Sequence, residues 1–119
     1  MRYVILIACD PADWADADEA TRREYFEAHH AFERHVAEHG TRLSSAALGD
    51  ADVATTVRHS PDGVTVTDGP FAELVEQLSG YYDVELPDLD TAIQAAKLLP
   101  RAYAVEVRPV TVIEGYEHA

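Results

Sequence analysis

The sequence contains little cysteine and no long apolar run. Among its 119 residues there is one cysteine, Cys9, which excludes an internal disulfide and favours a small buried thiol in a reducing compartment. The longest apolar run, YVILIAC at residues 3–9, is far shorter than the roughly 20 residues of a membrane-spanning helix. The first residues also lack the pattern of a signal peptide. We therefore expect a cytoplasmic protein with no membrane partner.

Basic side chains are also scarce. There are 9 lysines and arginines against 22 acidic residues, for a formal net charge of −13. A surface this negative repels phosphate backbones and anionic lipids, which argues against direct binding of nucleic acid. The hydrophobic fraction of 47% is ordinary for a globular protein, and the length suits a single domain over residues 1–119.

The order of predicted elements indicates the fold class. Residues 3–9 have the continuous apolarity of a strand covered on both faces, and the acidic residues 10–20 predict a loop. A helix is expected from an Asp18 cap to about His39, ended by Gly40, and another from an Asp88 cap to Pro100. Further strands are predicted in residues 41–50, 81–87 and 102–110, with a hairpin turning at residues 60–63 and a short helix within residues 69–80.

Without the hairpin and short helix, the order is βαββαβ, the ferredoxin-like arrangement of an α+β protein. Both helices of such a fold cover one face of the sheet. A chain of 119 residues has nothing left to cover the other face, so we expect a homodimer.

Four of the six histidines lie within EAHHAFERHVAEHG, residues 27–40. His35 and His39 fit the H-x-x-E-H pattern of certain zinc proteases and, four residues apart on a helix, could hold a metal together. That pattern belongs to larger proteases, which add a third ligand from a distant helix. We therefore assign no metal site and no cofactor.

His29 has a different position. It lies in the middle of a helical stripe formed with Tyr25, Phe32 and Val36. An imidazole on an apolar face needs partners for both ring nitrogens once water is removed. It is either a core histidine that hydrogen-bonds a backbone carbonyl, or a general acid or base that lines a pocket. The spacing alone leaves both interpretations open.

Other polar residues are weaker candidates. Asp68 ends a strand before a Gly-Pro turn, where its carboxylate could cap the predicted short helix or pair with an imidazole. Arg58 and Arg108 lie on strands and could bind an anionic substrate or form structural ion pairs. Tyr81 and Tyr82 alternate on their strand, so one is expected in the core and the other is free to line a pocket.

The sequence also resembles a known family. DGPFAE at residues 68–73, followed by EQLSGYY at 76–82 and VEVRPV at 105–110, is similar to the DGPF family of YCII-related proteins. RYVILI at residues 2–7, the H-x-x-F match from His29 to Phe32 and TTVR at 55–58 extend the resemblance over nearly the whole chain.

The resemblance implies a ferredoxin-like fold that pairs into a dimeric α/β barrel. In the wider YCII group a His–Asp pair has been proposed as the active site, with the histidine eleven residues before a glycine on the first helix. His29 has that spacing to Gly40, whereas Asp68 is the nearest substitute for the aspartate and stands on a different element. The chain also has Leu74-Val75 and Ser79-Gly80 where many relatives read DGPFAETKE and GGYY.

Two functions follow as expectations. The first is a small dimeric enzyme acting without a cofactor on a small cyclic or anionic metabolite, since some relatives act on small aromatic ring compounds. His29 would transfer the proton, Asp68 would orient it, and Arg58, Arg108 and Tyr81 would bind substrate. The second is a non-catalytic ligand-binding or regulatory module associated with transcription machinery, because some DGPF domains accompany sigma factors.

Overall fold

The computed structural model describes residues 1–72 and 75–116 of the chain. Its elements, in chain order, are β1 (Arg2–Cys9), α1 (Pro11–Ala15), α2 (Glu19–His39), β2 (Thr41–Ala47), the short 3₁₀ turn η1 (Ala51–Val53), β3 (Thr55–Ser60), β4 (Gly63–Asp68), β5 (Gln77–Glu85), α3 (Leu89–Ala96) and β6 (Ala104–Pro109).

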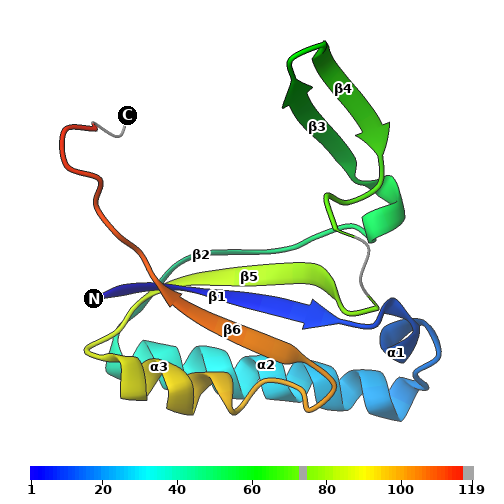
Figure 1. Cartoon of the computed structure of the whole chain (residues 1–119). Helices are drawn as coiled ribbons and strands as arrows, with labels where there is room; N and C mark the ends of the chain where they lie inside the picture. The colour runs from blue at the N-terminus through cyan, green and yellow to red at the C-terminus, as the bar shows by residue number, and fades with distance from the viewer. Residues whose placement is uncertain (73–74, 117–119) are drawn as a thin grey trace.

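Four strands form one antiparallel sheet in the order β2-β5-β1-β6. Helices α2 and α3 lie together on one face of this sheet, and the other face carries no helix of the described residues (Figure 1). The architecture is a mixed α+β fold, as predicted. Its strand order and the position of its helices are consistent with the ferredoxin-like arrangement.

The hydrophobic core fills the space between the sheet and the helices. Alternate residues of β1 point into it, so Tyr3, Ile5 and Ile7 are buried while the residues between them are half-buried. The other buried members of the core come from α2, β5, α3 and the segments that follow them: Phe32, Val36, Tyr82, Val84, Leu86, Ala92, Ala95 and Leu99.

Both predicted helix caps are confirmed. The Asp18 carboxylate accepts a hydrogen bond from the Thr21 backbone N–H at 2.8 Å, and that of Asp88 accepts one from Thr91 N–H at 2.8 Å. Each satisfies an N–H group that has no partner within its helix.

The prediction of a loop over residues 10–20 is wrong in part, because residues 11–15 form α1. Asp10 caps this helix by accepting from Ala12 N–H at 3.0 Å, and Pro11 supplies a first residue whose backbone is already set for a helix. The acidic composition of the segment concealed these two signals.

Gly40 ends α2 as predicted, but for a different reason. Its φ of −174° is extended backbone and does not require glycine. A Cβ atom built on Gly40 would lie 1.9 Å from the carbonyl oxygen of Glu85 on β5. The position therefore needs glycine because two backbones meet there at contact distance.

The predicted short helix within residues 69–80 is wrong for the described residues. Residues 70–72, 75 and 76 are irregular, and β5 begins at Gln77. Gln77 and Leu78 pair with Cys9 and Ala8 of β1, so hydrogen bonds of the sheet decide the backbone against local helix propensity. Residues 73 and 74 of this predicted helix lie outside the described residues.

The predicted hairpin is confirmed. Strands β3 and β4 form a separate two-stranded sheet, with Ser60 opposite Gly63 at the turn, and Gly63 has a φ of 130° that favours glycine. In Figure 1 this hairpin stands away from the four-stranded sheet, on the side opposite the helices, and so does the segment after β6. Most of the hairpin is exposed.

Among residues 1–72 and 75–116, no helix is both long enough and apolar enough to cross a membrane.

Candidate functional site

His29 is held by hydrogen bonds at both nitrogens of its ring. It extends from α2 toward the sheet and is half-buried. Nδ1 lies 2.8 Å from the hydroxyl oxygen of Tyr82 on β5, and Nε2 lies 2.9 Å from that of Tyr103, just before β6. The partners are tyrosine hydroxyls from two distant segments of the chain, not the backbone carbonyl that a simple core histidine would use.

The hydrogen bonds run in one direction. The Tyr82 hydroxyl donates its single proton to Oε2 of Glu33 at 2.8 Å, so it must accept from His29, whose Nδ1 therefore carries a hydrogen. In a neutral ring Nε2 is then an acceptor, and it receives the proton of the Tyr103 hydroxyl. Donation thus proceeds from Tyr103 to His29, then to Tyr82 and finally to Glu33.

Arg42 forms an ion pair with Glu33, the last acceptor in this series of hydrogen bonds. Its guanidinium group lies 3.4 Å from Oε1 of Glu33, the oxygen that Tyr82 does not use. The positive charge favours the carboxylate form of Glu33, which is the form that accepts from Tyr82. The direction of the chain is therefore supported at the end farthest from Tyr103.

The surroundings keep the three ring groups uncharged at neutral pH. Burial lowers the pKa of His29; the nearby charge of Glu33 opposes this shift, and that of His30 adds to it. Burial also raises the pKa of Tyr103 to about 12. The pKa of Tyr82 is raised first by burial and then by its hydrogen bond to Glu33. A neutral imidazole whose Nε2 accepts a hydrogen bond from the Tyr103 hydroxyl can take up a proton through that hydrogen bond.

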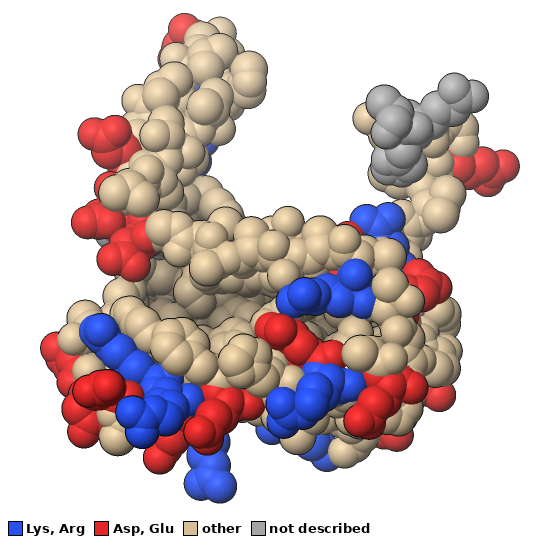
Figure 2. Space-filling model, turned by 180° about the vertical axis from the view of Figure 1, so that it is seen from behind, with Lys and Arg blue, Asp and Glu red and all other residues tan. Residues whose placement is uncertain are grey.

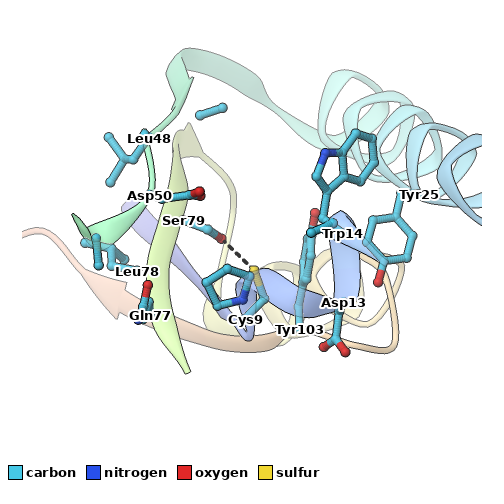
Figure 3. A pocket seen from close by; sticks show the side chains of 15 residues that line it. Cys9, Asp13, Trp14, Tyr25, Leu48, Asp50, Gln77, Leu78, Ser79 and Tyr103 are labelled. Carbon is cyan, nitrogen blue, oxygen red and sulfur yellow. Dashed lines mark hydrogen bonds between the residues drawn. The ribbon is translucent and has the colours of Figure 1, made fainter. Parts of the chain in front are cut away.

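Two adjoining hollows lie beside the chain of hydrogen bonds that runs from Tyr103 to Glu33. The first, of about 460 Å³, is lined by His29 and Glu33 of α2 and by residues of β2 and β5. The second, of about 420 Å³, lies between α1 and the start of β5 (Figure 3). Ala47, Ser79 and Tyr103 line both hollows, so Tyr103 stands where they meet. Each volume lies within the range of small-molecule pockets.

We call the two adjoining hollows together the recess, and it opens at the edge of the sheet. Figure 2 shows a hollow bordered mostly by uncharged residues, with acidic and basic side chains at one end of it and along the helix layer beneath it. Its opening thus faces solvent.

Aromatic rings form one wall of the second hollow. The ring centroid of Trp14 lies 5.8 Å from that of Tyr25, and the centroid of Tyr25 lies 5.9 Å from that of Tyr103 in an edge-to-face contact. The Arg22 guanidinium lies 4.5 Å from the centroid of Trp14 and donates to the Trp14 carbonyl at 2.9 Å. Helix α1, which the sequence did not predict, positions this indole.

Cys9 lines the second hollow as a free, half-buried thiol. Its Sγ lies 3.3 Å from Oγ of Ser79, whose hydroxyl in turn donates to the Ile7 carbonyl at 3.3 Å. These contacts tie the floor of the hollow to β1 and β5.

The residues predicted for the site are distributed over three regions. Tyr81 is among the residues that line the first hollow with His29, although alternation on β5 directs its side chain to the opposite face from that of Tyr82. Asp68 and Arg58 lie on the projecting hairpin, where Asp68 is opposite Thr55. Neither lines the two hollows.

The two predicted arginines each have a local partner. Arg58 donates to the Phe71 carbonyl at 2.7 Å, and Arg108 on β6 forms an ion pair with Glu106. The roles assigned to Asp68, Arg58, Arg108 and Tyr81 stay predictions.

Sequence reasoning missed two residues of the site, Glu33 and Tyr103. Glu33 had a signal, since it follows His29 by four residues and so lies on the same helix face. Tyr103 had none, because only the return of β6 beside β1 brings it to α2.

The other two histidines weighed from the sequence, His35 and His39, contact each other. Nδ1 of His39 donates to the His35 carbonyl at 2.8 Å, and the two ring centroids are 4.2 Å apart. Within the described part of the chain, no group of three or more histidine, cysteine, aspartate or glutamate residues is placed to hold a metal ion.

The fold and site define a class of protein: a small α+β domain with one sheet face open and a histidine-centred recess at the sheet edge. The family model of the YCII-related domain matches residues 1–114, and the chain belongs to this family. The chain is also similar to the uncharacterised protein R00369 of Rhizobium meliloti (strain 1021), with 34% identity over 125 residues and 98% of each chain covered. The resemblance stated from the sequence motifs is thereby confirmed.

Proposed function

We propose that this protein is a small-molecule enzyme in which His29 drives proton transfer to and from a compact ring compound. The observation that carries the proposal is the directed chain of hydrogen bonds from Tyr103 through His29 and Tyr82 to Glu33. A histidine needed only for packing has no use for a carboxylate at the end of such a chain or for a solvent-connected hollow beside it.

The direction of these hydrogen bonds suits the action of a general base. When a substrate loses a proton to the Tyr103 oxygen, the original Tyr103 proton passes to Nε2 of His29, which becomes an imidazolium. The negative charge of Glu33, acting across Tyr82, stabilises that imidazolium. The proton then returns along the same path to a different atom of the substrate, or leaves to solvent when an anion is eliminated. Either reaction requires no redox group.

The test is exchange of substrate hydrogen with solvent. The protein is incubated in D2O with a panel of small uncharged cyclic ketones and lactones, and loss of the proton signal beside the carbonyl is followed by NMR. We expect faster exchange than in buffer for at least one compound, and a loss of roughly 10²-fold or more in His29→Gln, as general acid–base catalysis contributes that much. Tyr103→Phe is expected to reduce the rate as well.

His59→Gln is the matched control, because His59 is an exposed histidine on the projecting hairpin. Circular dichroism confirms that each variant is folded. Exchange that is unaffected in His29→Gln, or absent across the panel for the wild type, would contradict the proposal. Binding without exchange would instead favour the non-catalytic ligand-binding module.

We further propose that the open face of the sheet pairs with a second copy of the chain. Val4 and Leu6 of β1 lie half-buried on that face, and the hairpin and the segment after β6 project on the same side (Figure 1). An isolated two-stranded hairpin is at best marginally stable in water, so contact with a partner would support it.

Light scattering coupled to gel filtration tests this pairing. We expect the mass of a dimer for the wild type and of a monomer for Leu6→Lys, which places a charge in the centre of the face. Ala37→Lys, on the exposed side of α2, is the control and should stay dimeric. A monomeric wild type at micromolar concentration would contradict the pairing.

A further inference from the structure

The second hollow has an unusual charge balance. Three aromatic residues, Trp14, Tyr25 and Tyr103, lie on one side of it in Figure 3, and Leu48 and Leu78 lie on the opposite side. The charged members of its described lining are Asp13 and Asp50, and this lining contains no lysine, arginine or histidine. The hollow therefore offers aromatic faces and negative charge to a ligand.

The two carboxylates come from separate segments. Asp50 precedes η1, where its side chain makes no capping hydrogen bond, and in Figure 3 it extends from the β2 side toward the hollow. Asp13 stands on α1, on the side of the aromatic rings. The negative charge of Asp13 contributes, after burial, to raising the pKa of Tyr25, so it acts on the aromatic wall itself.

We infer that this hollow binds a ring compound that carries an ammonium group. The inference rests on the proposed function, because it takes the hollow to be the substrate compartment that Tyr103 joins to His29. Cations are attracted both to the faces of aromatic rings and to carboxylates, whereas a carboxylate ligand would meet like charge and no basic partner among these residues.

The arrangement suggests how such a ligand would lie. Its ring would pack on the aromatic wall and against the leucines, and its ammonium group would be directed toward Asp50. The net charge of −13 adds a long-range attraction for cations, which is strongest at low ionic strength. Tyr103 would then stand beside the ring, with its hydroxyl group connected to His29.

A matched series of probes tests the ligand class: benzylammonium, benzyl alcohol and benzoate, which share one ring and differ in charge. Binding is measured by calorimetry and by ligand-observed NMR at low ionic strength. We expect benzylammonium to bind at least fivefold more tightly than benzyl alcohol, and benzoate to bind more weakly than either. Benzoate binding as tightly as benzylammonium, or no binding of benzylammonium at millimolar concentration, would overturn the inference.

Variants locate the site. Asp50→Asn should weaken benzylammonium about threefold or more and leave benzyl alcohol unchanged, and Trp14→Leu should weaken both probes. Asp62→Asn is the control, because Asp62 lies in the turn of the projecting hairpin and bears the same charge. Equal losses in Asp50→Asn and Asp62→Asn would mean that only the general field attracts the cation, and would overturn the site.

The failure of this inference is distinguishable from that of the proposed function. His29→Gln should bind benzylammonium within twofold of the wild type, because His29 does not line this hollow, while it loses hydrogen exchange. Benzylammonium binding that persists without any exchange activity in the wild type supports the site and contradicts the enzyme. Exchange activity together with preferred binding of benzoate supports the enzyme and contradicts the ligand class.

Discussion

The two halves of α2 present the same apolar stripe to different surroundings. In the C-terminal half, Phe32 and Val36 are 0% exposed, and the Phe32 ring lies 4.4 Å from that of Tyr82. In the N-terminal half, Tyr25 and His29 are half-buried and border the two hollows. One end of the helix is therefore packed as a core and the other is left open.

The two halves of α2 pack differently because the residues of the sheet that face them differ in size. Gly80 occupies the position two residues before Tyr82 on β5, on the face toward the helices, and has no side chain to fill the space. A Cβ atom there would lie 2.9 Å from the Ala46 carbonyl oxygen, so the close approach of β2 keeps this position small. The hollow beside His29 thus results from small residues opposite the helix, and the stripe of the helix itself does not reveal it.

Phe32→Ala should have the largest effect on stability. A fully buried ring leaves a cavity, and such substitutions cost about 3–5 kcal/mol of unfolding free energy. Chemical denaturation followed by circular dichroism measures the change. Tyr25→Ala, in the open half, is the matched comparison, and a loss as large as that of Phe32→Ala would show that the two halves are packed alike.

Tyr82→Phe should have a smaller effect, because it keeps the ring and removes only the hydroxyl. Nδ1–H of His29 and Oε2 of Glu33 would each lose a partner in a half-buried setting, at a cost of roughly 1–3 kcal/mol. The double variant with His29→Gln should show that the two losses are not additive. Strict additivity in that double-mutant cycle would mean that the two groups are not coupled.

The pH dependence of stability should show the smallest effect. Since the pKa of His29 is lowered by folding, the unfolded chain binds a proton near pH 6.5 while the folded imidazole remains neutral. The contribution of His29 is therefore fully present above about pH 6.5 and is lost as the pH falls through the lowered folded value.

Thermal unfolding between pH 5 and 8, compared in wild type and His29→Gln, isolates this contribution from that of the other histidines. NMR titration of the His29 ring provides an independent measurement. A folded His29 pKa above 6.5 would reverse the sign, and would indicate that Glu33 has more influence than burial.

Local signals in the sequence predicted much of the fold. The continuous apolarity of β1, the caps at Asp18 and Asp88 and the turn before Gly63 all depend on neighbouring residues, and the structure contains the strand, both caps and the turn. The failure at residues 69–80 has the opposite cause. The start of β5 is determined by pairing with β1, about 70 residues away in the chain, and local propensity carries no information on it.

The site divides in the same way. His29 was identified from its place on the helical stripe, which is a local property. The chemical partners of its ring come from β5 and from the segment before β6, and the hollow beside it depends on small residues of β2 and β5. Only the assembled sheet brings Tyr82 and Tyr103 to the same imidazole.

The contact at Gly40 has a mechanical consequence. Because the backbone of Gly40 lies against the Glu85 carbonyl, the C-terminal end of α2 has no room to move closer to β5. This end of α2 is fixed, whereas Tyr25, which contacts Trp14 of α1, lies about four helical turns away. A guest too large for the recess would therefore have to be accommodated by displacement of α1 and the first turns of α2.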